Sequence, residues 1–209
     1  AQTLANGDGL VWNSGAEPVE GFSNPLWVLV MAAVHLLPVP ANEVSRYVQL
    51  LSLAILTFNV VAVKMLAQEL SGSRWIALVA AGMTAFYYPL NNWSLQGMEV
   101  GLLALLVTAS SYLALRAHKR EVFSYWPYVL MGVAVLARMD AAVLALTMTL
   151  ILAWLDKDNR HQHLLWGLGA VALSLALLTT FRQAYYGEWL PNTYYLKLGG
   201  ISTPLRISL

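Results

Sequence analysis

Arg138 and Asp140 stand together in the segment ARMDAA (residues 137–142), and they are the charged residues of an apolar run from 126 to 155. An arginine that is alone at membrane depth costs several kcal/mol, so it needs a partner. That partner is either a carboxylate in a structural pair, from Asp140 or Glu99, or an anionic ligand. A guanidinium presents a planar fork of N–H donors that matches phosphate, and a lipid phosphate lies at this depth.

Two acids and an amide precede other apolar runs. Glu20 and Asn24 belong to the segment VEGFSNPLW (residues 19–27), and Glu99 opens the run 99–115. Asn24 is expected to cap a helix that starts at Pro25, or to bind substrate. Glu20 is either a solvated loop acid or an active-site acid. Glu99 is either an acid stabilised by a helix N-terminus or a carboxylate that faces a polar cavity.

A third cluster follows the last apolar run, in YYGEWLPNTYYLK (residues 185–197), and it contains Asn192, Tyr194 and Lys197. One interpretation is an aromatic belt at the membrane interface, with a lysine whose ammonium reaches water. The other is a substrate site in which Lys197 is a second cation for the same phosphate as Arg138.

The composition places these residues in a membrane protein. The 209 residues are 58% hydrophobic and 11% charged, whereas soluble domains carry about 25% charged residues. The absence of cysteine excludes disulfides, thiolate metal sites and cysteine nucleophiles. No basic run of the kind that binds nucleic acid occurs, and His161 and His163 are expected in a solvated loop rather than at a metal.

The apolar runs define the elements that must position the site. They cover residues 25–38, 47–68, 75–90, 99–115, 126–155 and 164–182. Since a spanning helix needs roughly 20 apolar residues, the runs 47–68, 99–115 and 164–182 are predicted to span, and 75–90 is marginal. The run 25–38 is too short, so it is predicted to be re-entrant or interfacial. The predicted class is an all-α, polytopic helical membrane protein.

The basic residues predict which loops share a side. Lysines and arginines gather near the loops at 69–74, 116–125 and 156–163, and the positive-inside rule places all three in the cytoplasm. The run 126–155 must then leave the cytoplasmic side and return, so it is predicted to be a hairpin of two short helices that turns at 137–142. The loops at 1–23 and 91–98 lie outside. Four polar elements are expected to converge there, at residues 17–25, 91–99, 138–140 and 185–197.

These motifs, in this order, resemble the GT-C glycosyltransferases, and in particular arabinofuranosyltransferase-like bacterial proteins of the cell envelope. The first loop, NGDGLVWNSGAEPVEGFSNPLWVLV, is similar to the first extracytoplasmic loop of that family. SLQGME (residues 94–99), ARMDA and YYGEWLPNTYYLK are similar to three further family elements. Met139 and Ala141 replace the proline and glycine that the family usually has in its hairpin turn.

The resemblance implies an inverting transfer of a sugar, such as arabinofuranose or another pentose or hexose, from a polyprenyl-phosphate donor. The acceptor is a glycan, lipid or protein outside the membrane. A carboxylate takes the acceptor proton, and cations stabilise the departing phosphate. Arg138 and Lys197 are predicted to bind the phosphate, Glu20 and Glu99 to support catalysis, and Asn24, Asn192, Tyr194 and Asp140 to bind substrate.

The resemblance also predicts the context of the chain. The family's catalytic aspartates precede the first loop, so the base is expected before Ala1, in a longer polypeptide. The expected parts are an incomplete first loop (1–24), a helical membrane module (25–182) and the start of a further extracytoplasmic segment (183–209). The location is a bacterial inner membrane, with the site facing the periplasm or cell exterior. No cofactor is required, and a divalent cation is compatible with carboxylates near a phosphate.

Two other classes share the same features. A secondary transporter also has buried charges and broken helices, although the sequence shows no inverted repeat. A membrane protein that binds lipid-linked sugar without catalysis is the second alternative. Release of a sugar product separates the enzyme from both.

Overall fold

The computed structural model describes residues 1–11, 15, 19–190 and 192. This part of the chain is helical and contains no strand. Its helices are α1 (Gln2–Ala5), α2 (Pro25–His35), α3 (Val44–Ser71), α4 (Arg74–Ala85), α5 (Tyr88–Leu95), α6 (Val100–Lys119), α7 (Trp126–Ala137), α8 (Ala141–Leu155) and α9 (Arg160–Tyr186).

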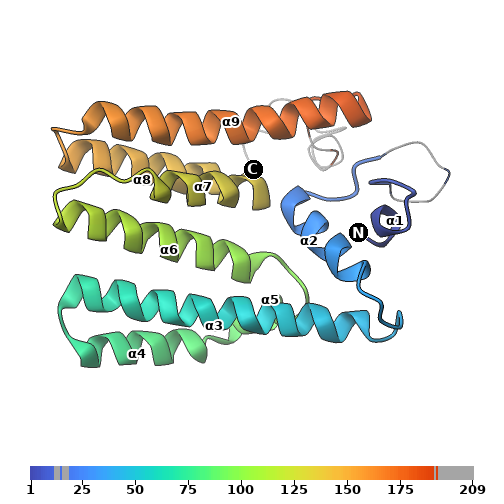
Figure 1. Ribbon diagram of the computed structural model, residues 1–209, viewed down its shortest axis with the longest axis horizontal. Coiled ribbons are helices and arrows are strands. Elements are labelled where there is room, and N and C mark those ends of the chain that lie inside the picture. The colour runs from blue at the N-terminus through green and yellow to red at the C-terminus, as the bar shows by residue number, and fades with distance from the viewer. Residues whose placement is uncertain (12–14, 16–18, 191, 193–209) are drawn as a thin grey trace, which may run out of the picture.

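Within these described ranges, three helices, α3, α6 and α9, are long and apolar enough to cross a membrane. They lie roughly parallel along the longest axis of the molecule (Figure 1). Large apolar side chains of α3 and α9, such as Phe58, Leu173 and Leu177, are exposed, as expected for helix faces that contact lipid. The protein is therefore a polytopic helical membrane protein, as the composition predicts.

The run 126–155 forms the predicted hairpin. Helices α7 and α8 have 12 and 15 residues, so each is short for a full crossing. Helix α7 ends because Arg138 adopts an extended backbone, with φ −152° and ψ 124°. The turn at 138–140 lies partway along the bundle, beside the beginning of α6 (Figure 1).

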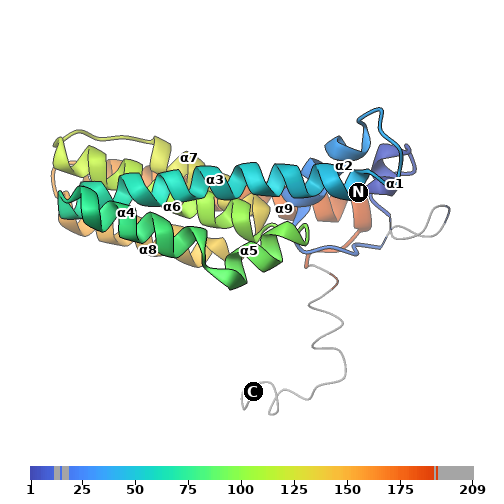
Figure 2. The same cartoon turned by 90° about the horizontal axis from the view of Figure 1, so that it is seen from below.

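The structure places the three basic loops, at residues 72–73, 120–125 and 156–159, at one end of the bundle (Figure 1 and Figure 2). We call this the basic end. Helix α2, with 11 residues, lies at the opposite end, where α3 begins. The three loops thus share one end, as predicted, and residues 25–38 contain a helix that is too short to span. The cytoplasmic side of the loops and the re-entrant or interfacial placement of this helix stay predictions. We call the end that carries α2 and the hairpin turn the site end.

Two details of the sequence prediction are wrong for the segment that connects α3 to α6. The run 75–90 contains a helix of only 12 residues, α4, which is below the spanning length. The segment 91–98, expected as a loop, is largely helical because α5 extends from Tyr88 to Leu95. Pro89 explains both differences: a proline ends a preceding helix and is well suited to the first turn of the next one.

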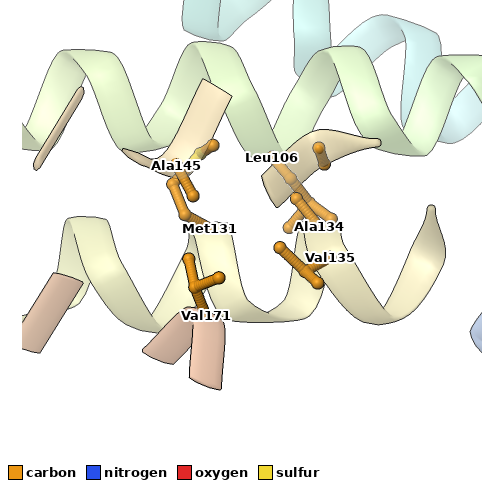
Figure 3. Close-up of a cluster of buried hydrophobic side chains, with 7 residues drawn as sticks. Leu106, Met131, Ala134, Val135, Ala145 and Val171 are labelled. Atoms are coloured by element: carbon orange, nitrogen blue, oxygen red, sulfur yellow. The ribbon is translucent and has the colours of Figure 1, made fainter. Parts of the chain in front are cut away.

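Small side chains bring the hairpin close to its neighbours. A cluster of buried apolar residues joins α6, α7, α8 and α9 (Figure 3). Among its members, Ala134 and Val135 of α7 are fully buried, and Ala141 and Ala145 of α8 are nearly so. Since lipid tails are as apolar as leucine, helices in membranes associate through such close packing rather than through a hydrophobic driving force between them.

The closest approach joins α8 to α9. A Cβ atom on Gly167 of α9 would overlap the Oγ1 and Cγ2 atoms of Thr149 of α8. Thr149 is buried, and its hydroxyl donates to the carbonyl of Ala145 at 2.7 Å, which fixes its rotamer. Gly169 lies two residues further along α9, and nothing lies within 4 Å of the position that a Cβ atom would take there.

The two glycines form a matched pair for testing this contact. We expect Gly167→Ala to destabilise the bundle by about 1–3 kcal/mol, because the new methyl group forces α8 and α9 apart. Gly169→Ala is expected to be neutral or slightly stabilising, since alanine has the higher helix propensity. Unfolding in detergent micelles measures both, and equal stability of the two variants would contradict the packing described here.

Candidate functional site

The hairpin turn holds Arg138 between two carboxylates. Its Nε donates to Asp140 Oδ1 at 3.0 Å and its Nη2 to Asp140 Oδ2 at 2.6 Å. Its Nη1 donates to Glu99 Oε1 at 3.1 Å, at the start of α6. Both carboxylates that the sequence suggests as structural partners are therefore used, and a phosphate ligand must coexist with them.

The guanidinium remains accessible. The side chains of Arg138 and Asp140 are 36% and 61% exposed, whereas that of Glu99 is 6% exposed. A guanidinium has five N–H donors, and three of them make the bonds above. Within the described part of the chain, two N–H groups thus remain for a further acceptor. The hydrogen bonds from Arg138 also hold the pKa of Asp140 below its usual value, so Asp140 is ionised near neutral pH.

Helix α2 is fastened to the same carboxylate. Asn24 occupies the N-cap position of α2, as predicted, but its side chain makes no capping bond. Instead its Nδ2 donates to Glu99 Oε2 at 2.7 Å. One helix turn away, Trp27 Nε1 donates to the carbonyl of Gly97 at 2.7 Å. Glu99 is therefore bonded on both oxygens, by Arg138 and by Asn24.

Glu20 lies in a second pair that the sequence does not predict. Arg182 Nε, near the end of α9, donates to Glu20 Oε1 at 2.9 Å and to Oε2 at 3.1 Å. The two side chains are 2% and 4% exposed. The solvated interpretation of Glu20 is therefore wrong, and its carboxylate is turned towards the protein interior.

Arg182 connects this pair to the hairpin turn. Its Nη1 lies 3.2 Å from the sulfur of Met139, the residue between Arg138 and Asp140. Its Nη2 is buried and has no hydrogen-bond partner among the described residues. Two groups of polar side chains thus lie on either side of Met139. We call them together the charged layer: Glu20 and Arg182 in one group, and Asn24, Glu99, Arg138 and Asp140 in the other.

Two tyrosines close the site end by holding the first loop. Tyr185 Oη accepts a hydrogen bond from the backbone N–H of Leu10 at 3.0 Å, and Tyr186 Oη donates to the carbonyl of Leu10 at 2.7 Å. Together with Glu20–Arg182, these contacts attach the N-terminal segment to the end of α9. In the sequence, Arg182 is the cation at the end of the apolar run 164–182. A basic residue in that position also occurs at ordinary helix ends, so the position alone does not identify Arg182 as part of a site.

Most of the third predicted cluster lies outside the residues that the structure describes, so its prediction stays untested. Asn192 is half-buried, while Tyr194 and Lys197 lie outside the described residues. Among the residues that are described, no three His, Asp or Glu side chains are close enough to hold a metal ion. The compatibility of the site with a divalent cation, bound by carboxylates near the donor phosphate, stays a prediction.

One histidine differs from its prediction at the basic end. His163 is buried, not solvated. Its Nδ1 lies 2.5 Å from Tyr128 Oη and its Nε2 lies 3.1 Å from Asp156 Oδ2. The histidine joins α7 to the start of α9, far along the bundle from the charged layer, and we assign it a structural role.

The buried pair at the site end provides a stability test. Removing one partner of a buried ion pair leaves an uncompensated charge, so Arg182→Met and Glu20→Gln should each cost about 3–5 kcal/mol. The double variant should recover part of that loss. The exposed pair Glu43–Arg46, at 2.7 Å on the same end, is the control, and Arg46→Met should cost at most about 1 kcal/mol. Equal losses for Arg182→Met and Arg46→Met, measured by unfolding in detergent micelles, would contradict the burial described.

Comparison with known proteins identifies the family of this chain. The family model described as dolichyl-phosphate-mannose-protein mannosyltransferase matches residues 24–181. Comparisons with curated proteins and with solved structures find no match. The matched range begins at Asn24 and ends beside Arg182, so it contains Glu99 and the entire hairpin. Because it covers well over half of the chain, this protein belongs to the dolichyl-phosphate-mannose-protein mannosyltransferase family, a family of membrane glycosyltransferases that use a polyprenyl-phosphate sugar as donor.

Proposed function

We propose that the protein transfers a sugar with inversion from a polyprenyl-phosphate donor to an acceptor outside the membrane, and that Arg138 binds the donor phosphate. The observation that carries the proposal is that this guanidinium is held in place and still has free N–H donors within the described part of the chain. It is fixed by two carboxylates at a turn between short helices and is partly exposed, and two of its N–H donors have no partner among the described residues.

The chemistry requires a cation at the leaving group. The acceptor hydroxyl oxygen attacks the anomeric carbon, and the bond from that carbon to the phosphate oxygen breaks. The electron pair leaves with the phosphate, and the hydroxyl proton passes to a carboxylate. A guanidinium already oriented at the phosphate stabilises the negative charge as it develops, and it does so without rearranging during the reaction.

The described carboxylates suit positioning better than proton transfer. Glu20, Glu99 and Asp140 each accept hydrogen bonds from an arginine, so their oxygens are engaged in holding that arginine in place. We assign Glu99 and Asp140 to orienting Arg138, and Glu20 to orienting the first loop through Arg182. These assignments leave the proton acceptor to a carboxylate other than these three.

The remaining assignments rest on the resemblance. Asn24 and Asp140 lie near the proposed phosphate position and are candidates for binding sugar hydroxyls, together with Asn192 and Tyr194. Lys197 is the candidate for a second cation on the phosphate. The first-loop motif favours arabinofuranose or another pentose, whereas the family description names mannose and a protein acceptor. We place the protein in a bacterial inner membrane with the site end outside.

Arg138 gives the sharpest test of this proposal. Arg138→Ala should lower sugar transfer from a polyprenyl-phosphate donor by about 10²–10³-fold, the effect typical of removing one group that stabilises developing charge. Arg138→Lys should retain more activity, because it keeps the charge but loses the fork. Arg46→Ala is the control. Arg46 is also an arginine paired with a glutamate at the site end, and we expect transfer within about twofold of wild type.

The outcomes separate the alternatives. Full transfer activity in Arg138→Ala, with folding unchanged, would overturn the phosphate assignment. A wild-type protein that binds polyprenyl-phosphate sugar but releases no sugar product would overturn catalysis and favour a binding protein or transporter.

A further inference from the structure

The position of Arg138 relative to the bundle depends on one contact. Asp140 lies two residues from Arg138 in the same turn and accepts two of its hydrogen bonds, so this pair can move as a unit. Glu99 Oε1, at the start of α6, accepts a third at 3.1 Å. Within the described part of the chain, Glu99 is the partner that ties the guanidinium to another element. The placement of the Glu99 carboxylate therefore sets the direction in which Arg138 points.

The backbone that carries Glu99 follows a tight turn between α5 and α6. Gly97 has φ 88°, in the left-handed region that favours glycine, and its N–H donates to the carbonyl of Ser94 at 3.0 Å. A Cβ atom on Gly101, in the first turn of α6, would lie 2.8 Å from Ser94 Oγ. The end of α5 and the start of α6 are thus packed closely against each other, with Glu99 at their junction.

Trp27 of α2 fixes this turn from outside. It is 3% exposed, and the N–H of a buried indole usually finds an acceptor. Its Nε1 donates to the carbonyl of Gly97 at 2.7 Å, two residues before Glu99. Asn24, three positions before Trp27, donates to Glu99 Oε2 at 2.7 Å. The beginning of α2 thus holds both the backbone of the turn and the carboxylate that follows it.

We propose that Trp27 is a positioning residue for the transfer reaction, and that it acts on Arg138 through the turn at Gly97 and through Glu99. The inference rests on the proposed function and deepens it, because it names a residue outside the charged layer that sets the orientation of the phosphate-binding guanidinium. A phenylalanine at position 27 keeps an aromatic ring but cannot donate to Gly97. The turn is then free to shift, and Glu99 loses its alignment with Arg138.

Transfer kinetics of the full polypeptide in nanodiscs test this role. Trp27→Phe should lower kcat about tenfold per folded molecule, since a misplacement of about 1 Å can cost about 10²-fold. The donor KM should stay within about twofold of wild type, because Arg138 keeps its charge. Trp93→Phe is the matched control. Trp93 lies on α5 beside the same turn and is 49% exposed, its indole donates no hydrogen bond within the described ranges, and kcat should not change.

A double variant separates positioning from a structural role. If Trp27 acts through Glu99, then Trp27→Phe should lower kcat by less than about twofold when Glu99→Ala is already present, because residues that act on one another are not additive. A Trp27 that serves packing alone would give the same tenfold loss with or without Glu99, and that result would overturn the proposal.

Labelling of Arg138 tests the same contact without any sugar transfer. Phenylglyoxal, which modifies guanidinium groups, should react with Arg138 about threefold faster in Trp27→Phe than in wild type, the size expected when a partly exposed ion pair is lost. Trp93→Phe should leave the rate unchanged, and the exposed Arg46 gives the reference rate in each protein. A tryptophan analogue with sulfur in place of Nε1, incorporated at position 27, keeps the shape of the side chain and should give the same acceleration.

The two readouts distinguish which assignment fails. Unchanged labelling of Arg138 in Trp27→Phe and in the sulfur analogue refutes the positioning role and leaves the proposed function intact. Faster labelling of Arg138 together with wild-type transfer refutes the part of Arg138 in the reaction, while the contact through Glu99 stands.

Discussion

Two arginines held by carboxylates beneath the end of a helical bundle impose much of the order at the site end. The charge of a guanidinium in an apolar surrounding must be balanced by a nearby anion. Arg138 meets this condition with Glu99 and Asp140, and Arg182 meets it with Glu20. These bonds bring together α6, α9, the hairpin turn and the first loop, which are far apart in the sequence.

The two arginines differ in burial, and we therefore assign a structural role to one and a chemical role to the other. Arg182 is buried and tied to an equally buried glutamate, so it fixes the first loop onto α9. Arg138 is partly exposed and keeps N–H donors that no described residue uses. An anionic phosphate suits an arginine in that state, and the family to which the chain belongs uses lipid-linked phosphates as donors.

Much of the fold follows from local patterns. The three long helices come from apolar length, and the hairpin comes from the parity of the basic loops together with an arginine in the middle of an apolar run. Helix α5 escapes prediction, because NNWSLQG is polar enough to resemble a loop. The pairs Glu20–Arg182 and Asn24–Glu99 escape it too, because they join residues 162 and 75 positions apart and depend on packing that no local pattern encodes.

The most direct test of the central claim is an experimental structure of the full polypeptide with a bound polyprenyl phosphate. We predict phosphate oxygens within hydrogen-bond distance of the Arg138 guanidinium, with the glutamate and aspartate beside it still in place. A phosphate bound elsewhere, with Arg138 enclosed by its two carboxylates alone, would contradict the role of this arginine.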